Sequence, residues 1–136
     1  MRTALLDTGP LVAYLDSADS AHETVAASLG GFVGTLCTTS AVITEAMYLL
    51  GDHSGGPRRL AEFVQAAGVH IFESTQHSQL HAAVVLMENY ADTPMDFADA
   101  TLVLLSDEVG TRDILTLDLR GFSAYRTRKG KSFRIV

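Results

Sequence analysis

Apolar and polar positions along the chain form short blocks that predict strands and helices in turn. Five short apolar runs have the length of buried strands, at positions 4–6, 35–38, 69–72, 114–117 and 133–136. Six stretches have the apolar spacing of helices, at about 10–15, 20–29, 40–50, 58–67, 75–90 and 96–105. Strands that alternate with helices from end to end are typical of an α/β domain with a mostly parallel sheet.

Several predicted helix ends carry residues that favour capping. Pro10 suits the first turn of the helix after the first strand. Ser20 and Ser40 are expected to cap the two helices that begin near them, because a serine hydroxyl can accept a hydrogen bond from a free backbone N–H. Gly30 and Gly31 are expected to end the first of these two helices.

The length of 136 residues fits one domain, 1–136, around one hydrophobic core. A hydrophobic share of 47% and a charged share of 19% are those of a globular chain and not of a disordered one. Cys37 is the only cysteine, so no disulfide can form within the chain and we expect a reducing compartment. Because neither a signal peptide nor a membrane-spanning run is apparent, we expect a cytoplasmic protein with no membrane contact.

The formal net charge of −6 argues against a protein that coats nucleic acid without specificity, since such proteins are usually basic. The basic residues are unevenly distributed, however. Half of the ten lie in the last eleven positions, as Arg126, Arg128, Lys129, Lys131 and Arg134. The simpler interpretation is a solvated tail. The alternative is a phosphate-contacting edge beside an acidic site.

Acidic residues recur where predicted strands end and helices begin. Asp7 ends the first strand, Asp118 ends the fourth, and Glu45 lies about one turn into the helix after the second. Asp96 and Asp99 are three residues apart and therefore share one face of a helix. Because ligands of an open parallel sheet collect at the carboxyl ends of its strands, we expect all these carboxylates on one rim.

Taken singly, most of these acids have ordinary structural explanations. An aspartate after a strand is usually a helix cap or a turn former, and Asp96 suits an N-cap. Glu45 alone is an ordinary exposed helix residue. Asp99 is different, because its apolar neighbours predict a mostly buried position, where an unpaired carboxylate is costly.

Taken together, the carboxylates indicate a site for a divalent metal ion. Like charges in one cleft raise each other's pKa unless a cation lies between them. Carboxylates without clustered His or Cys offer hard oxygen ligands, which suit Mg²⁺ or Mn²⁺ rather than zinc or copper. Such ions activate water and stabilise phosphodiester oxygens during in-line attack. The set therefore favours a phosphodiesterase site in an acidic protein.

Four segments resemble the motifs of the PIN-domain family, and of its VapC-type toxins in particular. They read, in the order in which the family has them, LLDTGPLVAYLD at 5–16, TTSAVITEAMYLL at 38–50, MDFADATLVLLS at 95–106 and ILTLDLRGF at 114–122. The resemblance spans nearly the whole chain, and it is the combination of the four motifs that makes it specific. It implies a three-layer α/β/α fold with a five-stranded, mostly parallel sheet.

The resemblance also implies roles for individual residues. Asp7, Glu45, Asp99 and Asp118 would bind metal and activate water, with Mg²⁺ or Mn²⁺ as the cofactor. Asp99 is preferred over Asp96 because it precedes Ala100 in the Asp-Ala step of the family, which leaves Asp96 as an auxiliary acid.

Three further positions matter in the comparison with the family. Thr8 follows the first aspartate, where a small hydroxyl residue is common, and Thr116 would orient water or phosphate. Gly121 departs from the family pattern, in which many members have an acidic residue before the phenylalanine. The family further implies an endoribonuclease toxin with an RNA substrate, a homodimer, and a cognate antitoxin protein that blocks the acidic pocket.

Two other functions compete with this prediction. An aspartate-nucleophile phosphatase would use Asp7, but a second aspartate two residues on is replaced by Gly9, and the only lysines are Lys129 and Lys131. A metal-dependent RNA-binding module would keep the pocket without cleaving. His77 and His81 have a spacing that can hold zinc, but without a glutamate after His77 or a nearby cysteine we interpret them as surface residues.

Overall fold

A parallel five-stranded sheet forms the centre of the computed structural model, which describes residues 2–136. The strands, in chain order, are β1 (Thr3–Leu6), β2 (Thr35–Thr39), β3 (His70–Phe72), β4 (Asp113–Leu115) and β5 (Arg134–Ile135). Their order across the sheet is β3-β2-β1-β4-β5, and every neighbouring pair is parallel. The α/β class and the parallel sheet predicted from the sequence are therefore confirmed.

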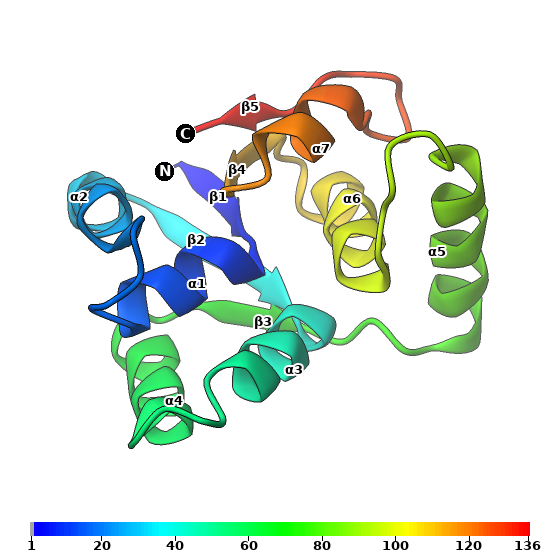
Figure 1. The fold of residues 1–136 in the computed structure, drawn as a ribbon. Helices are drawn as coiled ribbons and strands as arrows, with labels where there is room; N and C mark the ends of the chain where they lie inside the picture. Colours follow the sequence, from blue (N-terminus) through cyan, green and yellow to red (C-terminus); the bar gives the residue numbers. More distant parts are fainter. Residues whose placement is uncertain (1) are drawn as a thin grey trace.

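The helices lie in two layers on the sheet (Figure 1). They are α1 (Thr8–Leu15), α2 (His22–Gly31), α3 (Ser40–Leu49), α4 (Gly56–Ala66), α5 (His77–Asn89), α6 (Phe97–Val109) and α7 (Leu119–Ala124). The chain runs outward from β1 to β3 and then returns to the other side of β1 at β4. Because such crossovers are almost always right-handed, this reversal puts α1–α4 on one face and α5–α7 on the other. None of the helices within residues 2–136 is long and apolar enough to span a membrane.

The core is centred on β1, which is covered on both faces. Ala4, Leu5 and Leu6 have no exposed surface, as expected for a central parallel strand. Leu5 lies in register with Cys37 of β2 and Ile114 of β4. Cys37 is buried, as the sequence predicted. The apolar run that precedes Asp7 thus fixes the position of that residue at the carboxyl edge of the sheet.

The predicted cap of the second helix was wrong. Ser20 does not cap α2, which begins at His22. The preceding turn is held by Asp19, whose Oδ1 accepts a hydrogen bond from the Ala21 N–H at 2.8 Å. Gly30 and Gly31 do mark the end of α2, as expected, although both lie inside its last turn.

The predicted cap of α3 was displaced by one residue. Thr39, not Ser40, is the N-cap, and its Oγ1 accepts from the Val42 N–H at 3.3 Å. The same Thr39 hydroxyl lies 2.8 Å from the Thr101 hydroxyl of α6. A cross-layer contact of this kind is invisible in sequence, and it selects threonine over the neighbouring serine as the cap.

The segment after β4 differs most from the sequence prediction. The strand expected at 114–117 ends at Leu115, and a helix that was not predicted, α7, follows at Leu119–Ala124. Six residues are too few to display a helical period. The helix is instead stabilised by tertiary contacts, since Phe122 packs edge-on against Tyr125 and Phe133 at centroid distances of 5.1 and 5.4 Å.

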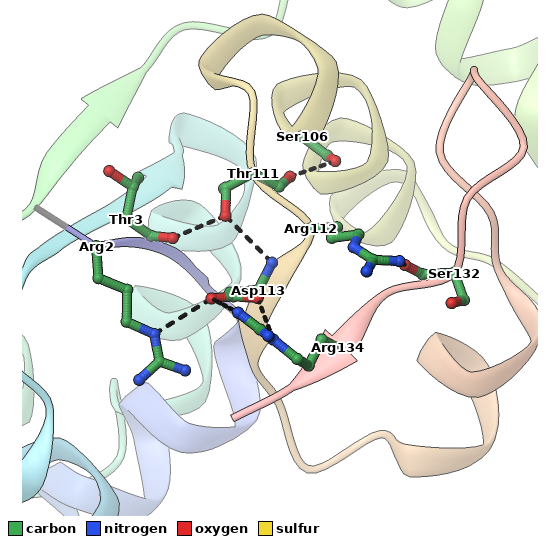
Figure 2. A network of polar contacts seen from close by, with 8 residues as sticks. All are labelled: Arg2, Thr3, Ser106, Thr111, Arg112, Asp113, Ser132 and Arg134. Carbon is green, nitrogen blue, oxygen red and sulfur yellow. Dashed lines mark hydrogen bonds and ion pairs between the residues drawn. The ribbon is translucent and has the colours of Figure 1, made fainter.

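A polar network joins the first, fourth and fifth strands where β4 begins (Figure 2). The buried Asp113 carboxylate accepts from Arg134 Nε at 2.7 Å, from Arg134 Nη2 at 2.8 Å and from Arg2 Nε at 3.2 Å. Thr111 Oγ1 donates to the Thr3 carbonyl at 2.7 Å in the same network. The Arg134 hydrogen bonds, followed by those of Arg2, hold the pKa of Asp113 below its usual value despite its burial.

We predict that Asp113→Asn destabilises the protein at neutral pH by about 1–2 kcal/mol, a charge-assisted hydrogen-bond energy reduced because both arginines are partly exposed. A lowered pKa means that the stabilisation is complete above the ordinary aspartate value and is lost as the pH falls through the folded-state value. Urea unfolding of both proteins at pH 7 and pH 3 measures this. The difference should shrink at pH 3, and equal stability at pH 7 would contradict the prediction.

Candidate active site

The acidic residues singled out in the sequence line one hollow at the carboxyl edge of the sheet. This acidic hollow has a volume of about 440 Å³, and its carboxylates belong to Asp7, Asp19, Glu45, Asp96, Asp99 and Asp118. They come from the ends of β1 and β4, from the α1–α2 loop, from α3 and from the start of α6. Residues more than a hundred positions apart therefore meet in one place.

The strand order explains why the hollow lies where it does. β1 and β4 are neighbours, but the chain leaves them in opposite directions across the sheet. A crevice outside the carboxyl ends of the strands is expected at such a reversal. Asp7 directly follows β1, and Asp118 follows β4 by three residues. The two aspartates therefore flank the crevice.

Asp7 is the most buried acid of the hollow, with 6% of its surface exposed. Its Oδ1 accepts from the Thr8 N–H at 2.8 Å, and its Oδ2 accepts from the Thr116 hydroxyl at 2.7 Å. Burial raises the pKa of Asp7 to about 6, in spite of these hydrogen bonds, and the charges of Asp96 and Glu45 add to the increase. Asp7 is thus held rigidly but is costly to ionise in the absence of a cation.

Asp118 is oriented from both sides. Its backbone N–H donates to Thr116 Oγ1 at 3.0 Å, and its own Oδ1 accepts from the Gly121 N–H at 3.0 Å. A Cβ atom on Gly121 would collide with the Asp118 carboxylate. This contact accounts for the departure from the family pattern at Gly121, because a side chain there would displace the carboxylate from its present position.

Asp96 and Asp99 form a reciprocal capping box at the start of α6. Asp96 Oδ1 accepts from the Asp99 N–H at 2.8 Å, and Asp99 Oδ2 accepts from the Asp96 N–H at 3.2 Å. The expected N-cap role of Asp96 is confirmed. Burial, then the charges of Asp96 and Asp7, raise the pKa of Asp99 to about 8. Asp99 is half-buried, and its other oxygen has no hydrogen-bond partner within residues 2–136.

One acid of the hollow was missed in the sequence, and so was a buried tyrosine whose pKa the acids affect. Asp19 lines the hollow from a loop, where an aspartate is usually just a turn former. Tyr125 is fully buried, and its hydroxyl donates to the Pro94 carbonyl at 2.7 Å. Burial raises the pKa of Tyr125, as do the charges of Asp99 and Asp118. The charges of the acids thus affect Tyr125, although it does not line the hollow.

The donor set fits Mg²⁺ or Mn²⁺ in its chemistry. It consists of hard carboxylate oxygens, and both Glu45 oxygens are free of hydrogen bonds to the described part of the chain. Thr8 Oγ1 lies at the same hollow as a buried hydroxyl without a partner, which is unfavourable unless a ligand supplies one. Within residues 2–136, however, no three acidic, His or Cys side chains are arranged so that they could hold an ion as they stand.

The basic C-terminal residues do not lie beside the acidic hollow, so the position predicted for a phosphate-contacting edge was wrong. Lys129 and Lys131 line a separate hollow at the C-terminal end of α6, whereas Asp99 is at the N-terminal end. Arg134 is bound to Asp113 where β4 begins. Arg126 donates to the carbonyls of the last turn of α7. The two exposed histidines of the sequence prediction lie on α5.

Comparison with known proteins gives concordant results. The family description "PIN domain" matches residues 4–127. Ribonuclease VapC26 of Mycobacterium tuberculosis (strain ATCC 25618 / H37Rv) is 32% identical over 133 residues, which cover 97% of this chain and 98% of that protein. The crystal structure of Mycobacterium tuberculosis VapC20, described as a sarcin–ricin-loop-cleaving toxin, superposes with a TM-score of 0.76. That match covers 86% of this chain and 90% of the other at 17% identity, and it concerns the fold alone.

The raised pKa of Asp99 gives a test of the electrostatics of the site. A group whose folded-state pKa lies above the unfolded value binds a proton on folding, so the stability of the metal-free protein falls as the pH rises from about 4 to about 8. Asp99→Asn removes this charge. In EDTA it should therefore raise the melting temperature, by a margin that grows between pH 5 and pH 8.

Thermal melts of parent and Asp99→Asn across this pH range measure the effect. Addition of Mg²⁺ should stabilise the parent more than the variant, because the ion offsets the repulsion that the variant lacks. A margin that is constant with pH would contradict the assigned environment of Asp99.

Proposed function

The chain belongs to the PIN-domain family, and from this premise we propose that it is a metal-dependent endoribonuclease, the toxin of a toxin–antitoxin pair. The observation that carries the proposal is the convergence of carboxylates from β1, β4, α3 and α6 on one hollow. A relative that matches nearly the whole chain is named a ribonuclease, which supports RNA as the substrate.

We assign Asp7, Glu45, Asp99 and Asp118 as the residues that hold Mg²⁺ or Mn²⁺. The bound ion would supply charge neutralisation, activation of water and stabilisation of the phosphodiester oxygens. The raised pKa values of Asp7 and Asp99 support this assignment, because both carboxyls gain most from a nearby cation. Asp96 has an auxiliary role, since it positions Asp99 through the capping box.

The chain itself contributes the orientation of the acids. Thr116 joins the two strand-end acids, because its hydroxyl donates to Asp7 and accepts from the Asp118 backbone. Asp7 and Thr8 are buried, so the inner wall of the hollow is fixed. Glu45 and Asp99 keep oxygens free to accept a proton from an attacking water. An arrangement of pre-oriented acids is what hydrolysis of a phosphodiester requires.

Of the competing functions, neither is favoured by a specific observation. An aspartate-nucleophile phosphatase needs a lysine near Asp7, but both lysines line the hollow at the other end of α6. An RNA-binding module without turnover is distinguished by the cleavage assay below. On the basis of the family we also propose that the protein is a single domain over 1–136, forms a homodimer, binds a cognate antitoxin protein and acts in the cytoplasm.

Asp7→Asn and Asp99→Asn should each abolish RNA cleavage and growth arrest on expression, because each removes a charge that the metal ion needs. Cleavage of a mixed RNA pool in Mg²⁺ or Mn²⁺, with EDTA as the negative control, measures this. The matched control is Asp52→Asn, which removes an exposed aspartate that does not line the hollow. Cleavage at the parental rate by either site variant, or RNA binding without cleavage by the parent, would refute the assignment.

Thr116→Val should lower kcat by about 10- to 100-fold, the usual effect of removing an outer hydrogen bond to a metal ligand. It should also raise the Mg²⁺ concentration needed for half-maximal rate. Thr116→Ser keeps the hydroxyl and should retain most activity. If valine and serine behave alike, the hydrogen bond to Asp7 has no role in the reaction.

A further inference from the structure

A second polar hollow lies at the C-terminal end of α6. Its volume is about 260 Å³, and three cationic residues, Arg112, Lys129 and Lys131, line it together with the single carboxylate of Asp107. We call it the cationic hollow. It differs from the acidic hollow in sign as well as in place, since the two share no residue.

The cationic hollow is built on an ordered turn. Arg126 and Ser132 form an antiparallel bridge, and between them the Thr127 N–H donates to the Lys131 carbonyl at 2.8 Å. Gly130 closes the turn with φ +79°, a conformation that favours glycine. Arg112 Nη1 donates to the Ser132 carbonyl at 3.3 Å, which joins the turn to the start of β4 (Figure 2). The turn therefore has little freedom to lose when a ligand binds.

The three cations are not neutralised by the protein. Among residues 2–136, no carboxylate oxygen lies within 4.0 Å of the charged nitrogens of Arg112, Lys129 or Lys131. Asp107 accepts a hydrogen bond from the Arg128 backbone N–H at 3.3 Å. By contrast, Arg2 and Arg134 at the same edge are paired with Asp113. The cationic hollow thus has an excess of positive charge in a chain of net charge −6.

We propose that the cationic hollow binds a backbone phosphate of RNA a few nucleotides away from the bond that is cleaved. This inference rests on the proposed ribonuclease function and adds to it a second point of attachment for the substrate. It makes the acidic hollow the place of chemistry and the cationic hollow a place of binding.

Electrostatics explains why such attachment is needed. A phosphate backbone approaching six carboxylates is repelled until a metal ion is bound, and affinity for nucleic acid comes largely from Lys and Arg contacts to phosphate. Asp99 and Asp107 lie eight residues apart on α6, or about 12 Å along its axis. That separation exceeds the Debye length of about 8–10 Å at physiological salt, so each hollow acts mainly on the phosphates nearest to it. A strand long enough to reach both would be attracted at the cationic hollow while the bond to be cleaved lies at the acidic hollow.

RNA fits this arrangement better than an acidic protein segment does. A polyanion of regularly spaced phosphates can offer one phosphate to the hollow that Lys129 and Lys131 line and a second to the acidic hollow. An acidic peptide would be attracted by the cations but has no phosphodiester for the acidic hollow to cleave. Arg112 adds the planar donor pair that recognises phosphate in a bidentate way.

The test measures RNA binding by fluorescence anisotropy in EDTA, where cleavage does not interfere, with oligomers of increasing length. Lys129→Gln/Lys131→Gln should weaken binding of long oligomers about tenfold at low salt. It should also lower the slope of log affinity against log salt by about 0.7 for each phosphate that the variant no longer neutralises. In Mg²⁺, oligomers too short to reach both hollows should be cleaved at the same rate by the parent and the double variant.

The chain offers a matched control in Arg58, an exposed cation of α4 on the other face of the sheet. Arg58→Gln should leave the affinity and the salt slope unchanged, and Lys129→Arg/Lys131→Arg should preserve both. Equal weakening by Arg58→Gln, or no weakening by the lysine-to-glutamine variant, overturns the proposal. If the lysines only offset the negative end of α6, their neutralisation lowers the melting temperature without weakening RNA binding, and this outcome also overturns the proposal.

Two further experiments test whether another anion, and not RNA, occupies the cationic hollow. Inorganic phosphate or poly-glutamate is titrated into the parent protein, and its ability to displace the bound RNA oligomers is measured. Saturation by either at low concentration without displacement of RNA overturns the proposal, because the hollow would then serve another anion. Failure of the parent to cleave any RNA refutes the proposed function instead, while the anisotropy measurement still reports on the hollow.

Discussion

Repulsion among carboxylates at one edge of the sheet is the constraint on which the rest of this structure depends. The pKa values of Asp7 and Asp99 are raised because burial and neighbouring negative charges oppose their ionisation. The fold tolerates this cost because the same acids also cap helices. Asp7 and Asp96 are the N-caps of α1 and α6, where the positive end of each helix favours negative charge. Structural and chemical roles are therefore combined in the same side chains.

The aspartates at the strand ends can cap a helix and line the metal site at the same time. The ordinary explanation of an aspartate after a strand, a helix cap, is correct for Asp7, Asp96 and Asp118. It does not compete with a role in metal binding, because a cap fixes one carboxylate oxygen and its position relative to the sheet. Glu45 is the exception, since it has no hydrogen bond to the described residues and is free to adjust.

The charge of the molecule is also separated in space along α6. Acidic side chains surround its N-terminal end, and unpaired cations surround its C-terminal end. A net charge of −6 therefore says little about contact with RNA, because the average conceals a positive region formed by Arg112, Lys129 and Lys131. The ion pairs of Arg2 and Arg134 with Asp113 hold the strands at this edge together and leave the other cations available.

The sequence by itself determined the strands, the parallel sheet and the set of acids, since periodicity and strand-end position are local properties. It failed where contacts between layers decide the outcome. The Thr101 hydroxyl makes Thr39 the cap of α3, and Phe133 stabilises α7, whose six residues are too short to show a period. Only the tertiary structure decided that Asp19 lines the site and that Lys129 and Lys131 lie away from it. The physical reason is that the order of the strands brings together side chains that are far apart in the chain. Strand pairing and burial fix that order jointly, and no single segment of the sequence encodes it.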